Sequence, residues 1–529
     1  MENCNPASAF SRMAAAHPER LAISVGKSQI SYGDLAAQAR AIAAHVGSTT
    51  KPVRVGILAS RSIEAYAGIL GAAWAGGTYI PLNLKWPAER LIALLDMLEL
   101  DALVVDAVGL QLLSPDVLAH APAKIVIPAN ASLQTPAGVT ATEITALPES
   151  AIAPVPVGPD HLAYVIFTSG TTGMPKGVMI SAGSLASYLA STRGWTAFTP
   201  EDRIAETCDV TFDLSVHNMY LCFEAGASLH LMSQLEMLGP QHFIRNRAIT
   251  AWMSVPTVLS LMTRTGALKP GIFPSLRLSI FCGEPLPLAG VQAWQAAAPN
   301  SDVENIYGPT EVTVICLRQR VTDEPAVTPG RGIIAIGRPY DTMDVAIFDD
   351  SQRRVPDGTP GEIAMRGPQV GIGYFGAPEQ TADRFRVIDG ERWYLTGDLG
   401  SRDPDGTFHH LGRVDNQVKV KGNRIELEEV EAHLRRAGGT DLVAAVAWPV
   451  TFGSAEGLVG FLAGTALGPT EIINTMLKSL PRYMVPTEIR VVDELPRNIN
   501  SKIDRRALFD TLEAARQDPP ATAKERSIA

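Results

Sequence analysis

The chain has 529 residues, too many for one ordinary hydrophobic core, and this length predicts two to four structural units. Apolar residues make up 46% and charged residues 19%, a composition typical of a soluble globular protein. The net charge of −10 argues against broad binding to a nucleic-acid backbone, because such binding depends on clustered Lys and Arg.

Cysteine usage and hydropathy indicate a reducing cytoplasm and exclude a membrane partner. The five cysteines form no C-x-x-C pair and are odd in number, so neither a disulfide framework nor a zinc site is predicted. The N-terminus has no apolar signal segment. Residues 65–84 are uncharged, but their four glycines and one proline favour a helix followed by a buried strand over a membrane span.

Strand-like and helix-like segments alternate from the N-terminus onward. We expect strands at 53–58, 78–82, 103–106 and 124–127, and helices at 62–75 and 87–98. This alternation predicts parallel sheets covered by helices. An irregular connection, 131–160, precedes a second αβ series that runs to about residue 299.

The pattern of predicted secondary structure changes from about residue 345, where shorter strands and turns begin. Asp-Gly pairs at 357–358 and 405–406 are hairpin signals, so we expect a small β-rich unit. A boundary follows near 413–416, and the remaining residues read as a separate domain of strands and helices. Residues from about 517 onward are polar, and we expect this end to fray.

The segment YVIFTSGTTGMPKGVMI, residues 164–180, places a Gly-, Thr- and Ser-rich loop between two apolar strand-like runs. Glycines free the backbone to expose N–H groups, and the hydroxyls and one lysine suit phosphate oxygens. A flexible surface loop is the alternative. The loop of residues 164–180 does not match the P-loop of the NTPases, because Pro175 stands where the second glycine of that motif belongs. The candidate phosphate ligands are Thr168, Ser169, Gly170, Thr171, Thr172, Gly173 and Lys176.

This string resembles the signature loop of the adenylate-forming enzymes, which include acyl-CoA synthetases, luciferases and nonribosomal peptide synthetase adenylation domains. The resemblance implies ATP and Mg²⁺ as cofactors. The second motif, NIYGPTEVTV, is similar to a family segment in which Tyr307 stacks on the purine, Thr310 contacts phosphate and Glu311 binds Mg²⁺. Alone, this motif could be an ordinary β-turn with one exposed acid.

Further nucleotide contacts follow from the same resemblance. In WYLTGDLG, Asp398 matches the carboxylate that accepts hydrogen bonds from the ribose hydroxyls, and Arg413 matches a second ribose or phosphate contact. The segments expected to line the adenine side contribute Gly283, Glu284, Pro285 and Asn305. Lys502 matches the catalytic lysine that bridges the substrate carboxylate and the α-phosphate, where a fixed cation offsets repulsion between two anions.

The segment TFDLSVHNMY, 211–220, resembles one wall of the substrate pocket in amino-acid adenylation domains. Asp213 matches the carboxylate that binds the substrate's α-ammonium group, although an Asp before a helix can also be an ordinary N-cap. The remaining matched positions are Leu214, His217, Met253, Ile280, Cys282, Ile306, Val314 and Ile315. This set is mostly apolar, so we expect a neutral, small to medium, largely apolar amino acid. His217 could hydrogen-bond a polar substituent or be a packed neutral histidine.

The resemblance also implies the domain plan. We expect an α/β core domain, 1–413, with two αβ-layered subdomains and a small β-rich subdomain. A hinge at 414–416, centred on Asp415, leads to a mobile α+β domain, 417–529, that rotates between adenylation and thiol transfer. No carrier segment follows the last motif. We therefore expect a free-standing enzyme that loads the phosphopantetheine thiol of a separate carrier protein.

Two other functions remain open at this stage. A CoA ligase for a carboxylic acid without an amino group would share every nucleotide motif, and Asp213 is the feature against it. A catalytically silent nucleotide-binding protein is disfavoured because Lys176, Glu311, Asp398 and Lys502 are all retained.

Overall fold

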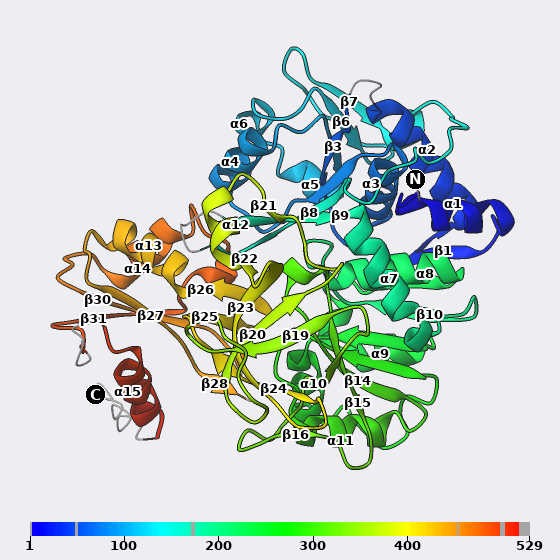
Figure 1. Ribbon diagram of the computed structural model, residues 1–529. Helices are drawn as coiled ribbons and strands as arrows, with labels where there is room; N and C mark the ends of the chain where they lie inside the picture. Colours follow the sequence, from blue (N-terminus) through cyan, green and yellow to red (C-terminus); the bar gives the residue numbers. More distant parts are fainter. Residues whose placement is uncertain (1–2, 48–50, 171–174, 452–453, 498–502, 518–529) are drawn as a thin grey trace, which may run out of the picture. The chain divides into compact units, whose positions relative to one another are not determined.

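The structure is a computed structural model that describes residues 3–47, 51–170, 175–451, 454–497 and 503–517 (Figure 1). The chain divides into two compact units. Unit 1 consists of Met1–Leu84, Arg90–Thr168 and Lys176–Asp415, and unit 2 of Lys85–Glu89, Ser169–Pro175 and Asn416–Ala529. The main boundary thus falls within the segment 414–416, where the sequence predicts a hinge.

Unit 1 contains an eight-stranded sheet. Its strands in spatial order are β21 (Gly373–Tyr374), β9 (Lys176–Ser181), β8 (Leu162–Thr168), β4 (Thr78–Pro81), β3 (Arg54–Leu58), β5 (Ala102–Val105), β6 (Lys124–Ile127) and β7 (Thr140–Glu143). The strands from β8 to β7 are parallel, whereas β9 pairs antiparallel with β8 and β21. The connecting helices are α2 (Tyr32–Val46), α3 (Ile63–Trp74), α4 (Ala88–Leu98), α5 (Ala107–Gln111), α6 (Pro115–Leu118) and η1 (Ile144–Ala146). The predicted βαβ alternation is confirmed.

A nine-stranded sheet forms the second αβ layer of unit 1. Its order is β18 (Arg338–Pro339), β15 (Leu317–Val321), β14 (Asp302–Tyr307), β13 (Leu278–Phe281), β12 (Ala251–Ser254), β10 (Arg203–Glu206), β11 (Ser228–Leu231), β1 (Leu21–Val25) and β2 (Ser28–Ser31). The six strands from β14 to β1 are parallel, so their carboxyl ends meet at one edge. Its helices are α1 (Ala7–Ala16), α7 (Ala182–Thr196), α8 (Leu214–Ala225), η2 (Glu236–Leu238), α9 (Pro240–Asn246), α10 (Pro256–Arg264), α11 (Leu288–Ala297) and η3 (Thr310–Val312).

One hydrophobic cluster joins the two large sheets of unit 1. It includes Ile57 and Val104 from the eight-stranded sheet and Leu229 and Met253 from the nine-stranded sheet. A second cluster lies under α10 and α11, which contact each other (Figure 1). Because α8 is buried along most of its length, a side chain at its first turn is fixed by packing on all sides.

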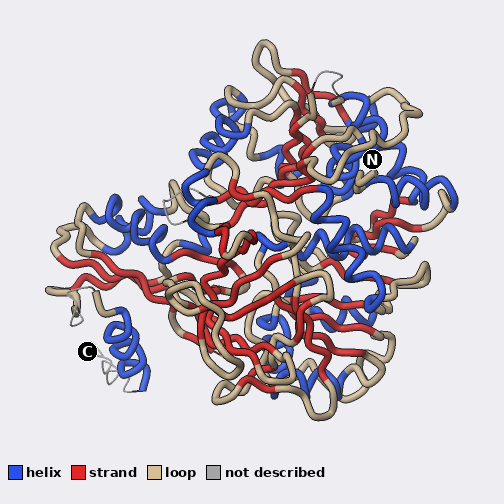
Figure 2. Tube along the Cα trace, in the orientation of Figure 1, coloured by secondary structure: helices blue, strands red, loops and turns tan. Residues whose placement is uncertain are grey.

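The β-rich part of unit 1 is antiparallel, as its turn signals predict, and strands and loops dominate it (Figure 2). Its strands are β19 (Asp344–Phe348), β20 (Gly361–Arg366), β22 (Phe385–Ile388), β23 (Glu391–Arg402) and β24 (Phe408–Arg413). The helix α12 (Pro378–Arg384) directly precedes β22, and the small pair β16 (Val327–Thr328) and β17 (Ile333–Ile334) precedes β18 in the sequence. Asp398 on β23 is paired in register with Arg413 on β24. This pairing sets two predicted nucleotide contacts side by side.

Unit 2 is a small α+β structure with its own core. One sheet contains β26 (Asn423–Glu426), β25 (Gln417–Val420), β29 (Ser454–Ala455) and β28 (Val450–Thr451), and the other contains β27 (Val443–Ala447), β30 (Leu458–Ala463) and β31 (Glu488–Val492). Its helices are α13 (Leu427–Gly438), α14 (Pro469–Met476), η4 (Arg482–Met484) and α15 (Arg505–Gln517). Ile425, Val430 and Leu458 belong to its main hydrophobic cluster. Within the described parts of both units, no helix combines the length and apolar character needed to cross a membrane.

Glu206, at the end of β10, is a fully buried carboxyl group. Its Oε1 accepts a hydrogen bond from the Cys208 backbone N–H at 2.9 Å. Burial raises the pKa of Glu206 from its ordinary value of 4.5 to about 8. The folded protein therefore keeps this proton over a pH range in which the unfolded chain has released it.

This difference predicts that stability falls as pH rises between 4.5 and about 8. Over that window the group alone contributes a slope of at most about 1.4 kcal/mol per pH unit. Glu206→Gln keeps the shape but cannot ionise, so its melting temperature should fall less than that of the wild type from pH 5 to pH 8. Parallel melting curves for the two proteins would contradict the assignment.

Candidate active site

The two strands on either side of the signature loop, β8 and β9, pair antiparallel in unit 1. Thr168, the last residue of β8, is paired with Lys176, the first residue of β9. The Thr168 hydroxyl is buried and has no hydrogen-bond partner among the residues that the structure describes. A buried hydroxyl in that condition is costly, and a phosphate oxygen would satisfy it.

Several residues predicted to contact the nucleotide or the substrate lie outside the described residues or outside unit 1. Outside the described residues lie Thr171, Thr172, Gly173 and Lys502. Ser169 and Gly170 belong to the short segment of unit 2 that follows β8. The remaining predicted site residues belong to unit 1.

Tyr374 on β21 joins two predicted groups, Lys176 and Glu311. The Lys176 ammonium lies 5.6 Å from the centroid of the Tyr374 ring. The Tyr374 hydroxyl donates a hydrogen bond to Glu311 Oε1 at 2.9 Å. Glu311 lies in η3 and is fully buried. The lysine and the carboxylate expected to face the nucleotide thus contact the same aromatic side chain.

The donor set at Glu311 fits a metal that arrives with a nucleotide. In the described part of the chain, no group of three or more His, Cys, Asp or Glu side chains could hold a metal ion. Mg²⁺, however, is commonly bound by one or two carboxylates together with substrate phosphates and water. One hard carboxylate therefore suits Mg²⁺ shared with phosphates, but would not make a permanent metal centre.

Asp398 is the centre of a buried charged cluster. Its carboxylate accepts hydrogen bonds from the Tyr307 hydroxyl and from Arg413 Nη1. His410 Nε2 lies 3.5 Å from Asp398 Oδ1. Burial opposes ionisation, but the contact with His410 and the charge of Arg413 outweigh it and hold the pKa of Asp398 well below its usual value. An anionic acceptor is therefore present across the whole working pH range.

Arg413 also reaches the predicted hinge residue. Its Nε and Nη2 donate to the two carboxylate oxygens of Asp415 at 2.6 and 2.7 Å. Arg384 Nη2 makes a longer contact of 3.5 Å with the same carboxylate. The last residue of unit 1 is thus tied to the cluster around Asp398 by a single bidentate guanidinium.

Two residues predicted on the adenine side have structural hydrogen bonds. The Glu284 carboxylate accepts hydrogen bonds from the Thr257 backbone N–H, at 2.8 Å, and from the Thr257 hydroxyl. Glu284 thus provides an acceptor for a backbone N–H in the first turn of α10. Asn305 Nδ2 donates to the Ala335 carbonyl at 2.8 Å. Gly283, with φ +85°, allows the turn that positions Glu284. These bonds shape the loops at the strand ends.

Asp213 stands directly before α8. Among the described residues, its side chain accepts no capping hydrogen bond from that helix, so the alternative of an ordinary N-cap is wrong. Tyr164 on β8 is fully buried, and burial together with the charge of Asp213 raises the pKa of its hydroxyl well above the usual value. The carboxylate therefore lies close to a buried aromatic wall.

The other predicted substrate contacts come from α8, from the ends of neighbouring parallel strands and from the turn after η3. Met253 on β12 is paired in register with Ile280 on β13. All eight are buried, namely Leu214, His217, Met253, Ile280, Cys282, Ile306, Val314 and Ile315. Apart from His217, they belong to the same hydrophobic cluster. This large cluster places the seven apolar residues in the same hydrophobic interior, where Met253 and Ile280 are neighbours.

The turn after η3 is strained. Thr313 and Val314 have φ values of +55° and +69°, a conformation that β-branched residues rarely adopt. The fully buried residue Gln369 makes two hydrogen bonds with this turn. Its carbonyl oxygen on the backbone accepts from the Thr313 hydroxyl at 2.6 Å, and its side-chain amide donates to the Ile315 carbonyl at 2.8 Å. The position of Val314 therefore depends on a residue far away in sequence.

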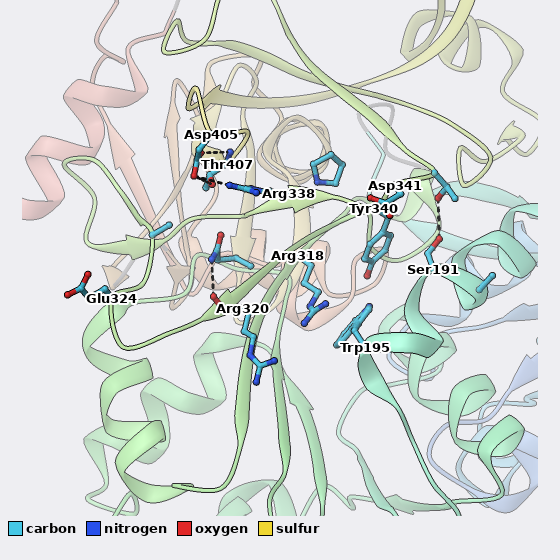
Figure 3. A pocket seen from close by; sticks show the side chains of 15 residues that line it. Ser191, Trp195, Arg318, Arg320, Glu324, Arg338, Tyr340, Asp341, Asp405 and Thr407 are labelled. Carbon is cyan, nitrogen blue, oxygen red and sulfur yellow. Dashed lines mark hydrogen bonds and ion pairs between the residues drawn. The ribbon is translucent and has the colours of Figure 1, made fainter.

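A surface pocket of about 810 Å³ lies apart from every predicted site residue (Figure 3). Arg318, Trp195 and Tyr340 gather at one end of it. The arginines that line the pocket are already paired with carboxylates: Arg318 with Glu304, Arg320 with Asp302 and Arg338 with Asp405. Because these charges are balanced, the pocket has no excess positive charge for an anionic substrate.

Sequence reasoning missed four residues that hold the site together. They are Tyr374, His410, Gln369 and Tyr188, which contact Glu311, Asp398, the strained turn and His217 respectively. Only Tyr374 had a visible signal, since it lies in the glycine-bounded run GIGYFG. The other three act through contacts between segments that are distant in the chain.

Comparison with known proteins gives consistent results. Residues 10–375 match the family described as AMP-binding enzyme. The antimetabolite synthetase AmbB of Pseudomonas aeruginosa is 34% identical over 94% of this chain. Tyrocidine synthase 3 of Brevibacillus parabrevis is 32% identical over 94% of this chain. The chain spans only 38% of AmbB and 7% of tyrocidine synthase 3.

A solved structure of similar length has the same fold. The Vibrio cholerae adenylation domain AlmE, in complex with glycyl-adenosine-5′-phosphate, superposes with a TM-score of 0.88 at 30% identity. The alignment covers 97% of this chain and 98% of that one. The α/β fold and the predicted motifs agree with both comparisons. The chain therefore belongs to the AMP-binding enzyme family, within the adenylate-forming superfamily.

Proposed function

We propose that the protein activates a neutral, small to medium, largely apolar α-amino acid as its aminoacyl-AMP, with release of pyrophosphate. The observation that carries this proposal is the position of Asp213. Its carboxylate does not cap α8, and its charge acts on the buried hydroxyl of Tyr164. One carboxylate oxygen of Asp213, Oδ2, is buried, and a cation beside a carboxylate favours its ionised form. A substrate ammonium group would supply one.

The apolar residues around Asp213 support a neutral substrate side chain. Met253, Ile280 and Ile306 are at most 2% exposed and offer no opposite charge to an ionised side chain. The likeness to AlmE, whose structure contains glycyl-adenosine-5′-phosphate, supports a small one. Substrate and nucleotide are then held from different elements of the same unit.

On the nucleotide side, each residue has a distinct role. Asp398, an anion held by Arg413, accepts hydrogen bonds from the ribose, while Thr168 and Lys176 contact phosphate oxygens. Glu311 would hold Mg²⁺, which supplies charge neutralisation at the phosphates when bound. In-line attack by a carboxylate on the α-phosphorus requires positioning and electrostatic stabilisation more than proton transfer.

The second half-reaction is proposed from the resemblance to amino-acid adenylation domains. The aminoacyl group passes to the phosphopantetheine thiol of a separate carrier protein, and AMP leaves. Lys502 acts in the first half-reaction only, and the segment 414–416 around Asp415 is the hinge between the two conformations.

The amine requirement can be measured by ATP–pyrophosphate exchange across neutral amino acids, in both enantiomers, beside matched desamino acids. We expect exchange with a small amino acid and none with its desamino analogue. Asp213→Asn removes the anion that binds the ammonium, and charged hydrogen bonds of this kind predict a loss of about 10- to 100-fold in kcat/KM. Exchange supported by the desamino acids instead would place the protein among CoA ligases.

The ribose contact gives a second prediction. Asp398→Asn loses the anionic acceptor and leaves Arg413 without its partner, so the KM for ATP should rise by about tenfold or more. The amino-acid KM, measured at saturating ATP, should change much less. An equal rise in both KM values would mean that the substitution disrupts the fold around the site.

Lys502 separates the two half-reactions. Lys502→Ala should abolish aminoacyl-AMP formation, because repulsion between the two anions is no longer offset. Thiol transfer from a supplied aminoacyl-adenylate to a carrier protein should remain near the wild-type rate. Equal loss of both activities would contradict the proposed rotation.

A further inference from the structure

His217 lies one helical turn after Asp213 on α8. Residues four apart share one face of a helix, and side chains tilt toward its N-terminus, so the imidazole projects back over the turn that begins at Asp213. The ring is fully buried. Burial lowers the pKa of His217 to about 3, which keeps it neutral at every pH at which the enzyme would work.

Aromatic rings fix the orientation of this imidazole. Its centroid lies 6.0 Å from that of Tyr188, 5.9 Å from that of Trp195 and 6.5 Å from that of Phe198. Trp195 also lines the surface pocket of Figure 3. A ring packed in this way cannot turn to find another partner.

The two ring nitrogens of His217 have different surroundings. Nδ1 is hydrogen-bonded to the Tyr188 hydroxyl on α7. Nε2 is buried and, in the described part of the chain, has no hydrogen-bond partner. Because the two nitrogens point in different directions, Nε2 faces away from Tyr188.

The hydrogen bond with Tyr188 indicates which nitrogen carries the proton. If Nδ1–H donated to the hydroxyl, both the tyrosine proton and the Nε2 lone pair would be left without a partner. If the hydroxyl donates to Nδ1, only Nε2–H is left. Since each unsatisfied buried polar group is costly, the second arrangement is favoured. His217 thus presents a single N–H donor.

A water molecule is a poor partner for this donor. Buried water needs two to four polar contacts, roughly three on average. Three of the residues predicted to contact the substrate, Met253, Ile280 and Ile306, are buried and have apolar side chains, and the rings near His217 are aromatic. A substrate oxygen, by contrast, arrives with its position fixed by the bond between its ammonium group and Asp213.

We propose that His217 Nε2–H donates a hydrogen bond to an oxygen in the substrate side chain, with Tyr188 as the positioning residue that sets the tautomer. Cβ atoms four residues apart on a helix are separated by only about 6 Å. The acceptor therefore lies close to the α-carbon. The substrate class becomes small α-amino acids with a hydroxyl on the β-carbon. This inference rests on the proposed amino-acid activation, and it changes the expected substrate side chain from a largely apolar one to a small one with a hydroxyl group.

Isosteric substrates test the proposal in the wild-type enzyme. ATP–pyrophosphate exchange would give kcat/KM for serine against 2-aminobutyrate and for threonine against valine, in both enantiomers. Each pair exchanges a hydroxyl for a methyl group of similar size. We expect the hydroxyl compound to be preferred by about 10- to 100-fold in at least one pair, the range of one hydrogen bond to a buried group. Equal or better activity with both methyl compounds would overturn the proposal.

Variants separate hydrogen bonding from packing. His217→Leu removes the donor and should reduce the preference to within about threefold. His217→Gln is the matched control, because its amide nitrogen occupies nearly the position of Nε2 and should retain part of the preference. Tyr188→Phe removes the hydroxyl that sets the tautomer of His217, so it should also lower the ratio of kcat/KM for the hydroxyl compound to that for the methyl compound. An unchanged preference in His217→Leu would overturn the proposal.

Failure of the underlying function would look different. Exchange with desamino acids alone, in the wild type, would overturn both the amino-acid activation and the role of His217. Exchange with amino acids but without a hydroxyl preference would overturn the role of His217 only.

Discussion

The buried carboxylate of Asp398 is the interaction on which the arrangement of unit 1 depends. It binds Tyr307 at the end of β14 and Arg413 on β24, and so connects the nine-stranded sheet with the β-rich part. Arg413 continues the connection to Asp415, the last residue of the unit. A carboxylate buried with this much positive charge stays ionised. The same anion can therefore stabilise the fold and receive the ribose of a nucleotide.

The substrate side of the site follows from a different constraint, the parallel sheet. Its strand ends meet at one edge, and α8 packs there as a buried helix. Apolar residues at those ends make a dry surrounding in which one carboxylate and one imidazole act strongly. Asp213 and His217, one helical turn apart, would then bind the ammonium group and the side-chain oxygen of a small amino acid. Tyr188 and Trp195 keep the imidazole in place from α7.

The sequence predicted the alternating αβ elements well because each has a strong local pattern. The strand expected at 124–127 is β6, and the helix expected at 87–98 is α4, one residue shorter. Contacts between distant segments could not be predicted in this way. Gln369 supports the strained Thr313–Val314 turn from more than fifty residues away, a separation at which no periodicity or spacing carries information. The roles of Thr171, Thr172, Gly173 and Lys502 remain predictions.

The most direct measurement is a crystal structure with a non-hydrolysable seryl-adenylate analogue, for example a seryl sulfamoyl adenosine. The account predicts that the ammonium group lies within hydrogen-bonding distance of Asp213 and the ribose hydroxyls at Asp398. It also predicts the serine oxygen at His217 Nε2. An analogue bound with its ammonium group away from Asp213, or with its ribose away from Asp398, would contradict the central claim that these side chains form one amino-acid adenylation site.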